Sequence, residues 1–155
     1  MTPVAVLPAD VPHLYIRISC RGNPGPGGWG VVVVRGDEVV ERGSGGSPAT
    51  TNNRLELTAV IAGLRLIPQQ LAVICTTSDY LYQGATKWIR GWRKRNWRKK
   101  SGEEIANGDL WTKIDMLNGR YPLRWSNVKG EELAWLEEAN QLANQEAEEM
   151  LGRAT

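Results

Sequence analysis

A glycine- and proline-rich stretch constrains this chain more than any other part of it: Gly22-Asn23-Pro24-Gly25-Pro26-Gly27-Gly28-Trp29-Gly30. Glycine adopts positive φ and lets another backbone approach closely, whereas proline fixes φ and lacks an N–H donor. Apolar runs flank the stretch, at residues 14–16 and in the four valines at 31–34. Taken alone, the pattern predicts a rigid turn between two strands, as in an ordinary hairpin loop.

The segments around this turn predict an antiparallel meander. Residues 14–19 form its first strand. The run at 30–34 is rich in β-branched valine, which favours a strand buried on both faces. A tight turn at 35–37 leads into a third strand at 38–43, and a loop follows at 43–48.

A helix follows the meander and returns the chain to the sheet. Asn52 or Asn53 caps it, and Pro68 ends it. The short apolar run at 71–75 predicts a buried strand, which a helical crossover makes parallel to its neighbour. The remaining elements are a helix capped by Ser78 and ending at Gly84, helices at 86–95 and 109–117, a strand at 123–128 and a last amphipathic helix at 131–151.

Composition and length predict one cytoplasmic domain. An apolar content of 41% and a charged content of 23% are ordinary for a globular protein of 155 residues. We expect an irregular N-terminal arm at residues 1–12 and a single domain at 13–155, with no signal peptide or membrane span. Cys20 and Cys75 lie in apolar, strand-like surroundings, which favours two buried thiols in a reducing cytoplasm over a disulfide.

The net charge of +2 conceals two oppositely charged segments. Residues 87–100 carry eight of the 19 basic residues, interleaved with Trp88, Trp92 and Trp97. Residues 131–149 carry seven of the 17 acidic ones. A basic segment that also holds aromatic side chains is typical of a nucleic-acid-binding surface, although a charge run is more often only a solvated face. We expect Trp88 and Trp111 in the core and Trp92 and Trp97 partly exposed.

Two motifs together resemble the signature of the type 1 ribonuclease H family. One is the Gly22–Gly30 stretch, and the other is Thr50-Thr51-Asn52-Asn53-Arg54-Leu55-Glu56-Leu57. The resemblance covers residues 14–143. It implies a ribonuclease H-like α/β fold: a five-stranded mixed sheet, with three antiparallel strands plus parallel strands, and helices on both faces. It also implies an active site of four carboxylates around two divalent ions, which hydrolyses the RNA strand of an RNA–DNA hybrid.

At the four carboxylate positions that the resemblance implies, this chain keeps only Glu56. Arg17 stands at the first position, Thr77 at the third and Asn140 at the fourth. The loop histidine that the family carries after Val-Lys-Gly is also missing, because Gly130 is followed directly by Glu131. Hard cations need anionic oxygen ligands. These substitutions therefore predict an inactive homologue, not an enzyme, with no metal site and no cofactor.

The lost site leaves Arg17 beside Glu56, and we expect the two to form a buried ion pair in place of the ions. Arg17 is also predicted to attract a phosphate of the nucleic acid.

The resemblance assigns the binding surface to residues that are all present. Asn23, Asn52 and Asn53 match residues that read 2′-hydroxyls and minor-groove edges, and Thr51 matches a residue near a DNA-strand phosphate. Independently of the family, an asparagine side chain offers a 2′-hydroxyl both a donor and an acceptor. The basic segment at 87–100 matches the family's basic protrusion and completes the interface. The binding residues of this protrusion are Trp92, Arg93, Lys94, Arg95, Trp97 and Arg98.

The main prediction is thus an inactive module that binds RNA–DNA hybrid or another nucleic acid duplex, within a nucleoprotein complex. A second hypothesis is a metal-dependent ribonuclease H with a rebuilt or residual centre, using Mg²⁺ or Mn²⁺ at Glu56 with Asp79, Glu137 or Glu138. A third is a protein-interaction scaffold that docks through the N-terminal arm or the acidic last helix. No membrane partner is expected.

Overall fold

The computed structural model describes residues 11–67, 71–120 and 122–154. Most of the predicted arm at 1–12 lies outside these ranges and stays a prediction. Pro68 also lies outside them, but the helix before it is described to its last residue, Arg65. Within the ranges described, no helix combines the length and the apolar character needed to cross a membrane.

Five strands form one mixed sheet in the order β3-β2-β1-β4-β5, as the resemblance implies. The strands are β1 (His13–Cys20), β2 (Gly25–Arg35), β3 (Glu38–Thr50), β4 (Ala72–Thr76) and β5 (Leu123–Asn127). β1, β2 and β3 pair antiparallel, whereas β4 is parallel to both β1 and β5.

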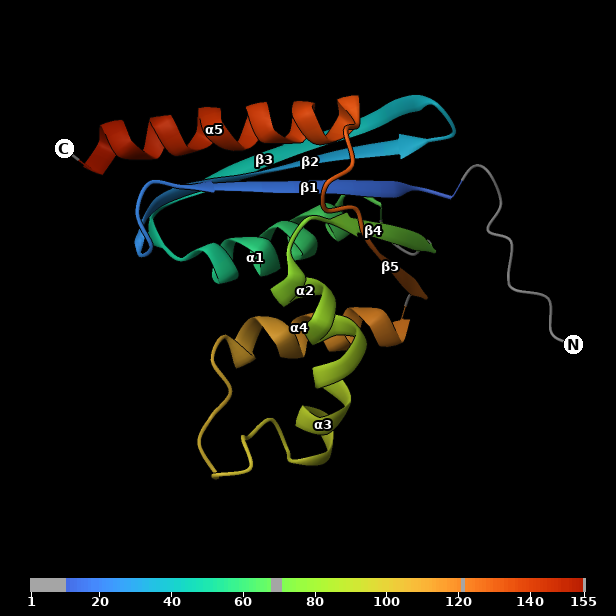
Figure 1. Cartoon of the computed structure of the whole chain (residues 1–155), viewed down its shortest axis with the longest axis vertical. Helices are drawn as coiled ribbons and strands as arrows, with labels where there is room; N and C mark the ends of the chain where they lie inside the picture. Colours follow the sequence, from blue (N-terminus) through green and yellow to red (C-terminus); the bar gives the residue numbers. More distant parts are fainter. Residues whose placement is uncertain (1–10, 68–70, 121, 155) are drawn as a thin grey trace, which may run out of the picture.

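Helices cover both faces of this sheet (Figure 1). They are α1 (Asn52–Arg65), α2 (Asp79–Gln83), the π-helical turn η1 (Gly84–Trp88), α3 (Ile89–Lys94), α4 (Gly108–Arg120) and α5 (Ala134–Ala154). α1 packs on one face with α2 and α4 beyond it, and α5 lies alone across the other face.

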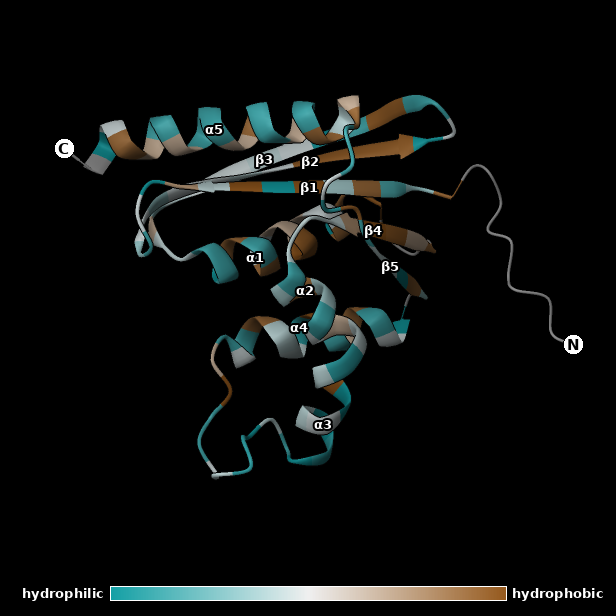
Figure 2. Ribbon diagram, viewed as in Figure 1, coloured by the Kyte–Doolittle hydropathy of each residue, from teal (hydrophilic) through white to brown (hydrophobic). Residues whose placement is uncertain are grey.

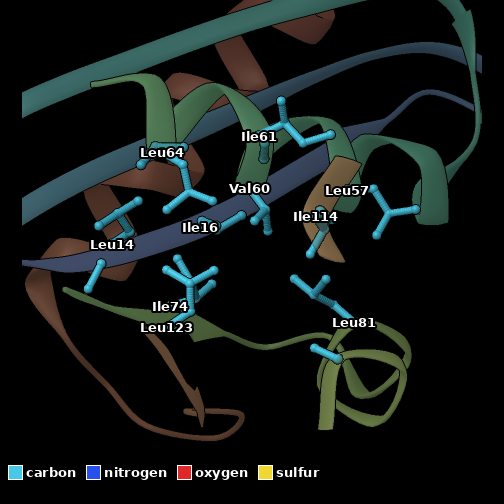
Figure 3. Close-up of a cluster of buried hydrophobic side chains, with 14 of the residues drawn as sticks. Leu14, Ile16, Leu57, Val60, Ile61, Leu64, Ile74, Leu81, Ile114 and Leu123 are labelled. Atoms are coloured by element: carbon cyan, nitrogen blue, oxygen red, sulfur yellow. The ribbon is translucent and has the colours of Figure 1, made fainter. Parts of the chain in front are cut away.

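Alternation along the strands divides the core into two clusters, one on each face of the sheet. Leu14, Ile16 and Val31 belong to the larger cluster, with α1, α2 and α4 (Figure 3). Tyr15 and Val32 face the opposite way and pack with α5. The four valines of β2 are fully or almost fully buried, as the sequence predicts. Figure 2 shows the same pattern, with apolar strands inside and a hydrophilic outward side on α5.

The glycine-rich stretch is mostly strand rather than turn, which corrects the prediction. β2 begins at Gly25, so only residues 21–24 form the loop. A side chain at Gly28 or Gly30 would collide with the backbone of α5 at Ala143 or Ala139. These glycines therefore serve close packing between β2 and α5, and not chain reversal.

Other element bounds also differ from the prediction. The expected loop at 43–48 belongs to β3, because its residues pair with the glycines of β2 and Gly45 lies against the Trp29 ring. α4 continues through Asn118 and Gly119 to Arg120, so this Asn-Gly pair does not end the helix.

Thr51, and not Asn52 or Asn53, caps α1: its hydroxyl accepts a hydrogen bond from the Arg54 N–H at 3.2 Å. The predicted cap at Ser78 is confirmed, because its hydroxyl accepts from the Leu81 N–H at 3.1 Å.

The tryptophans of the protrusion follow the prediction with one exception. Trp111 is fully buried, and Trp92 and Trp97 are half-buried. Trp88, however, is 42% exposed and not a core residue. Its ring lies 6.0 Å from that of Tyr80 and 6.0 Å from that of Trp92 between ring centres, so it packs on this aromatic cluster from the solvent side.

Candidate functional site

The candidate site lies where β1 and β4 separate. Their last paired residues are Ile16 and Thr76, and Arg17 and Thr77 follow directly. On the other side of β1, Arg17 pairs with Gly30. Ends of adjacent parallel strands commonly form ligand sites because the diverging chains leave a crevice between them.

Glu56 reaches this point from the first turns of α1 and is buried, with 7% of its surface exposed. Burial raises the pKa of its carboxyl from 4.5 to about 7, and the nearby Arg17 guanidinium opposes that rise only in part. The Oε2 atom of Glu56 has no hydrogen-bond partner. With this pKa, about half of the Glu56 carboxyls are protonated near pH 7. The group can therefore accept a proton, donate one or coordinate a ligand.

The predicted ion pair between Arg17 and Glu56 is not formed. Among the described residues, no nitrogen of Arg17 lies within 4.0 Å of a Glu56 oxygen, although the two groups interact electrostatically. The reason is burial: Glu56 is enclosed on the α1 side of β1, whereas Arg17 is half-exposed and opens toward α5.

Asn140 belongs to the part of α5 that crosses this position. A side chain on Gly30, the partner of Arg17, would meet the carbonyl oxygen of Ala139, so residues around Asn140 lie over the Arg17–Gly30 pair. Arg17, Glu56, Thr77 and the segment around Asn140 thus lie near the point where β1 parts from β4; their roles as the four ligand positions stay a prediction.

An open cavity of about 500 Å³ adjoins Arg17. The segment before α5 and the first turn of that helix form its other walls, and they contribute the carboxylates of Glu131, Glu132 and Glu137. Glu137 therefore faces the same space as Arg17.

The other two candidates for a rebuilt centre are engaged elsewhere. Asp79 is fully exposed, and its pKa is lowered by hydrogen bonds from Lys129 at 2.8 Å and Asn127 at 3.1 Å. Glu138 pairs with Arg42 at 3.0 Å.

The asparagines assigned to binding meet at the start of α1. The Asn23 Oδ1 atom accepts a hydrogen bond from the Asn52 N–H at 3.0 Å, which joins the β1–β2 loop to the helix. Asn52 and Asn53 are exposed, and Thr51 is half-buried as the cap. A row of exposed amides beside close-packed glycine backbone is suited to a polynucleotide groove.

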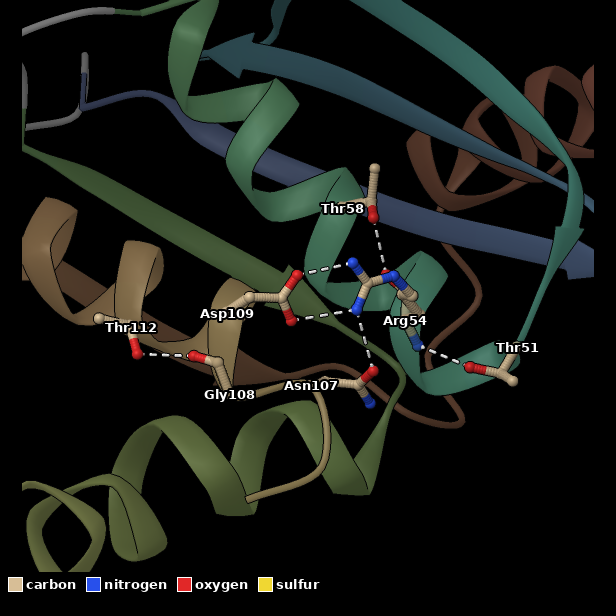
Figure 4. Close-up of polar contacts among 7 residues, drawn as sticks. All are labelled: Thr51, Arg54, Thr58, Asn107, Gly108, Asp109 and Thr112. Carbon is tan, nitrogen blue, oxygen red and sulfur yellow. Dashed lines mark hydrogen bonds and ion pairs between the residues drawn. The ribbon is translucent and has the colours of Figure 1, made fainter. Parts of the chain in front are cut away.

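A polar network that the sequence analysis did not single out connects this row to the protrusion (Figure 4). The Arg54 guanidinium donates to both carboxylate oxygens of Asp109, at 3.1 and 2.7 Å, and to the Asn107 Oδ1 atom at 3.2 Å. Asn107 ends the loop that follows the protrusion, and Asp109 lies in the first turn of α4. The Asn-Asn-Arg triplet was the signal available for Arg54, whereas Asn107 has no signal in the sequence.

The protrusion carries its cations in different states of pairing. Arg93 makes a two-pronged ion pair with Asp115, at 2.6 and 3.2 Å. Arg95 and Arg98 donate to backbone carbonyls within the protrusion, at 3.3 and 3.0 Å. Lys94 is exposed and has no such contact within the described part of the chain. Trp92 and Trp97 lie 6.5 Å apart between ring centres and stiffen this surface.

Comparison with known proteins identifies the chain's relatives. The family model described as RNase H matches residues 12–151. The chain is 46% identical over 135 residues to a ribonuclease H of Alkalilimnicola ehrlichii, covering 85% of this chain and 91% of that one. It is 44% identical over 137 residues to a ribonuclease HI of Neisseria meningitidis serogroup B, covering 87% and 94%.

Among solved structures, LC9-RNase H1 superimposes with a TM-score of 0.77 at 32% identity, covering 93% of this chain and 75% of its own. That protein is described as a type 1 RNase H with the type 2 active-site motif.

These similarities overturn two predictions. We expected an inactive homologue that is not an enzyme, but proteins 44–46% identical over more than four fifths of this chain are named as ribonucleases. The inactive interpretation is therefore wrong. The expectation of no cofactor is wrong with it, because the named activity belongs to a metal-dependent family. The missing carboxylates misled the prediction because the sequence was judged against a single active-site motif.

Proposed function

Because the chain belongs to the ribonuclease H family, we propose that it is itself a ribonuclease H, which binds an RNA–DNA hybrid and hydrolyses the RNA strand. The observation that carries this proposal is the 44–46% identity, over most of both chains, to proteins named for that activity. The gathering of Glu56 and the exposed asparagines on one side of the sheet is consistent with it.

The binding roles follow from the chemistry of the exposed groups. Asn23, Asn52 and Asn53 would contact 2′-hydroxyls and base edges in the minor groove of an A-like duplex. Thr51 would contact a phosphate of the DNA strand. The protrusion, with Lys94, Arg95 and Arg98 beside its tryptophans, would supply affinity that is independent of sequence.

The residues present do not fit a site in which four carboxylates hold two ions. Among the residues described, no three His, Cys, Asp or Glu side chains lie close enough to hold a metal ion. The unpartnered Oε2 of Glu56 suits one ligand, but the neighbouring side chain is the cation of Arg17. Arg17, Thr77 and Asn140 therefore lie outside the catalytic groups of the proposed enzyme.

Glu137 is the best partner for Glu56 in a rebuilt centre. It lines the cavity beside Arg17, one helical turn before Asn140, and its carboxylate has no hydrogen bond or ion pair within the described chain. Asp79 and Glu138 would first have to leave Lys129 and Arg42. The description of LC9-RNase H1 supports such a reading, because that protein carries a different active-site motif on a type 1 enzyme.

We also propose that the protein acts in the cytoplasm. Cys20 and Cys75 are both free thiols, which suits the reducing compartment that the sequence predicts.

A cleavage assay tests the proposed activity. The wild type, Glu56→Gln and Glu137→Gln proteins are incubated with a labelled RNA–DNA hybrid, with Mg²⁺, with Mn²⁺ or with chelator, and products are resolved on a denaturing gel. We expect the wild type to cleave only the RNA strand, and only with a divalent ion. Glu56→Gln should abolish cleavage, and Glu137→Gln should lower it at least about ten-fold.

The two variants also control for a contaminating nuclease, since all three proteins are purified in parallel. Equal cleavage by the wild type and Glu56→Gln would show that the activity comes from elsewhere. Absence of cleavage with either ion, at protein in excess over hybrid, would contradict the proposal.

A further inference from the structure

The Arg17 guanidinium has an unusual position for an arginine in the middle of a sheet. It is half-exposed at the point where β1 leaves β4, and it lines the open cavity of about 500 Å³. Within the described residues it makes no hydrogen bond and no ion pair. Five planar N–H donors therefore face a space that the chain itself does not fill.

The surroundings of this guanidinium limit what can occupy the space. Three carboxylates, from Glu131, Glu132 and Glu137, line the same cavity. The cavity as a whole is therefore not positive, and a small free anion gains little by entering it. An anion that belongs to a molecule already bound elsewhere on the protein can enter more readily. Its local concentration at the cavity is set by those other contacts and not by the cavity's own potential.

A nucleic-acid backbone bound at the exposed asparagines is such an anion. The Asn23–Asn52 contact lies at the start of α1, and Glu56, four residues further along the same helix, interacts with Arg17. A duplex seated on those amides passes the end of β1. Arginine matches the two non-bridging oxygens of a phosphate with two parallel hydrogen bonds.

We propose that Arg17 binds a backbone phosphate of the hybrid, so that the chain's own cation supplies positive charge at the centre of the site. This inference rests on the proposed function, because it requires a hybrid on the asparagine face. It adds a binding residue that acts without a metal ion.

The test measures hybrid affinity in chelator, where metal-dependent cleavage cannot interfere. Fluorescence anisotropy of a labelled hybrid is followed over a range of KCl concentrations for the wild type, Arg17→Gln, Arg17→Lys and Arg120→Gln. Arg120 is the matched control: it is exposed and ends α4 just before β5 begins, at the opposite end of the sheet from Arg17.

We expect Arg17→Gln to weaken binding about ten-fold at about 100 mM KCl. The slope of log affinity against log salt should become shallower by about 0.9, because one phosphate contact is lost. Arg17→Lys should keep the slope and recover part of the affinity, since it retains the charge but not the planar fork. Arg120→Gln should match the wild type.

A salt slope unchanged in Arg17→Gln would overturn the inference, even if affinity falls, because a merely structural role weakens binding without removing a phosphate contact. Wild type that cleaves hybrid with Mg²⁺ but does not bind it in chelator would overturn the inference and leave the proposed function intact. A wild type that binds hybrid through Arg17 but never cleaves it would overturn the proposed function and leave the inference intact.

Discussion

Glu56 is the only charged side chain that is buried among the residues the structure describes. Its burial raises the pKa of the carboxyl to about 7, and the field of Arg17 does not restore the ordinary value. A carboxyl kept in this condition lowers the stability of the fold at neutral pH. A buried carboxyl that destabilises the fold in this way often has a function, which agrees with the role proposed for Glu56.

Titration of Glu56 should make the free energy of unfolding depend on pH. The unfolded chain releases the Glu56 proton near 4.5 and the folded chain near 7. Below 4.5 both states hold the proton, so Glu56 has no effect. Between these values only the folded state keeps it, so the free energy of unfolding falls as pH rises, and the full loss remains above 7.

Glu56→Gln removes this titration. In chelator the variant should match the wild type near pH 4.5 and exceed its free energy of unfolding by about 3 kcal/mol at about pH 8. Urea unfolding at several pH values measures this difference. The exposed Glu149→Gln serves as control and should follow the wild type. A Glu56→Gln curve parallel to the wild type would show that Glu56 does not titrate in this range.

At the scale of elements, the packing of α5 on β2 depends on small residues. Gly28 and Gly30 bring the strand against the helix backbone at Ala139 and Ala143, and both alanines are fully buried. This contact also fixes where Asn140 and Glu137 lie relative to β1. Stability and site geometry therefore share one interface.

Gly30→Ala tests that interface. The added Cβ would overlap the Ala139 carbonyl oxygen and the Leu142 side chain, so we expect a loss of about 2–3 kcal/mol in the free energy of unfolding. Gly119→Ala in α4 is the matched control, because a Cβ there meets nothing within 4 Å. That variant should be unchanged or more stable by up to about 1 kcal/mol. Equal effects of the two would show that α5 does not pack as described.

The elements that the sequence predicts correctly are those in which local pattern and tertiary packing agree. The valine strand, the helix after Asn52 and the parallel return strand all follow from apolar periodicity. The predictions fail where the structure of a segment depends on another segment that is distant in the sequence. The glycines of β2 look like a turn until α5 covers them, and residues 43–48 become strand because β2 is long enough to pair with them.

The same reasoning explains the outcome at the site. Arg17, Glu56 and Asn23 could be singled out from two short motifs, and the structure brings Glu56 near Arg17 and Asn23 to the start of α1. Asn107 could not be predicted, because it reaches Arg54 only through the loop that follows the protrusion. Activity was misjudged for a different reason: the sequence offered Asp79, Glu137 and Glu138 as substitutes, but only the structure shows that Glu137 faces the cavity.

Across the whole molecule, charge is separated along its long axis. The basic protrusion around α3 and the acidic helix α5 lie at opposite ends, with the sheet and α1 between them (Figure 1). A polyanion is therefore attracted to the protrusion and repelled from α5, which orients the duplex before any specific contact forms. Whether the acidic end docks a protein partner stays a proposal.

Within the protrusion, pairing should decide how much each cation contributes to hybrid binding. Arg93 is already neutralised by Asp115, whereas Lys94 is exposed and unpaired in the described structure. A free cation releases a counterion from the duplex when it binds, but a cation shared with a carboxylate releases less.

Lys94→Ala should therefore make the salt slope of hybrid binding shallower by about 0.9, and Arg93→Ala by clearly less. Anisotropy titrations in chelator measure both slopes, and Asp115→Asn provides the internal control. Freeing Arg93 in that variant should steepen the slope. If Arg93→Ala and Lys94→Ala shift the slope equally, the Arg93–Asp115 pair opens on binding and the protrusion acts through its total charge alone.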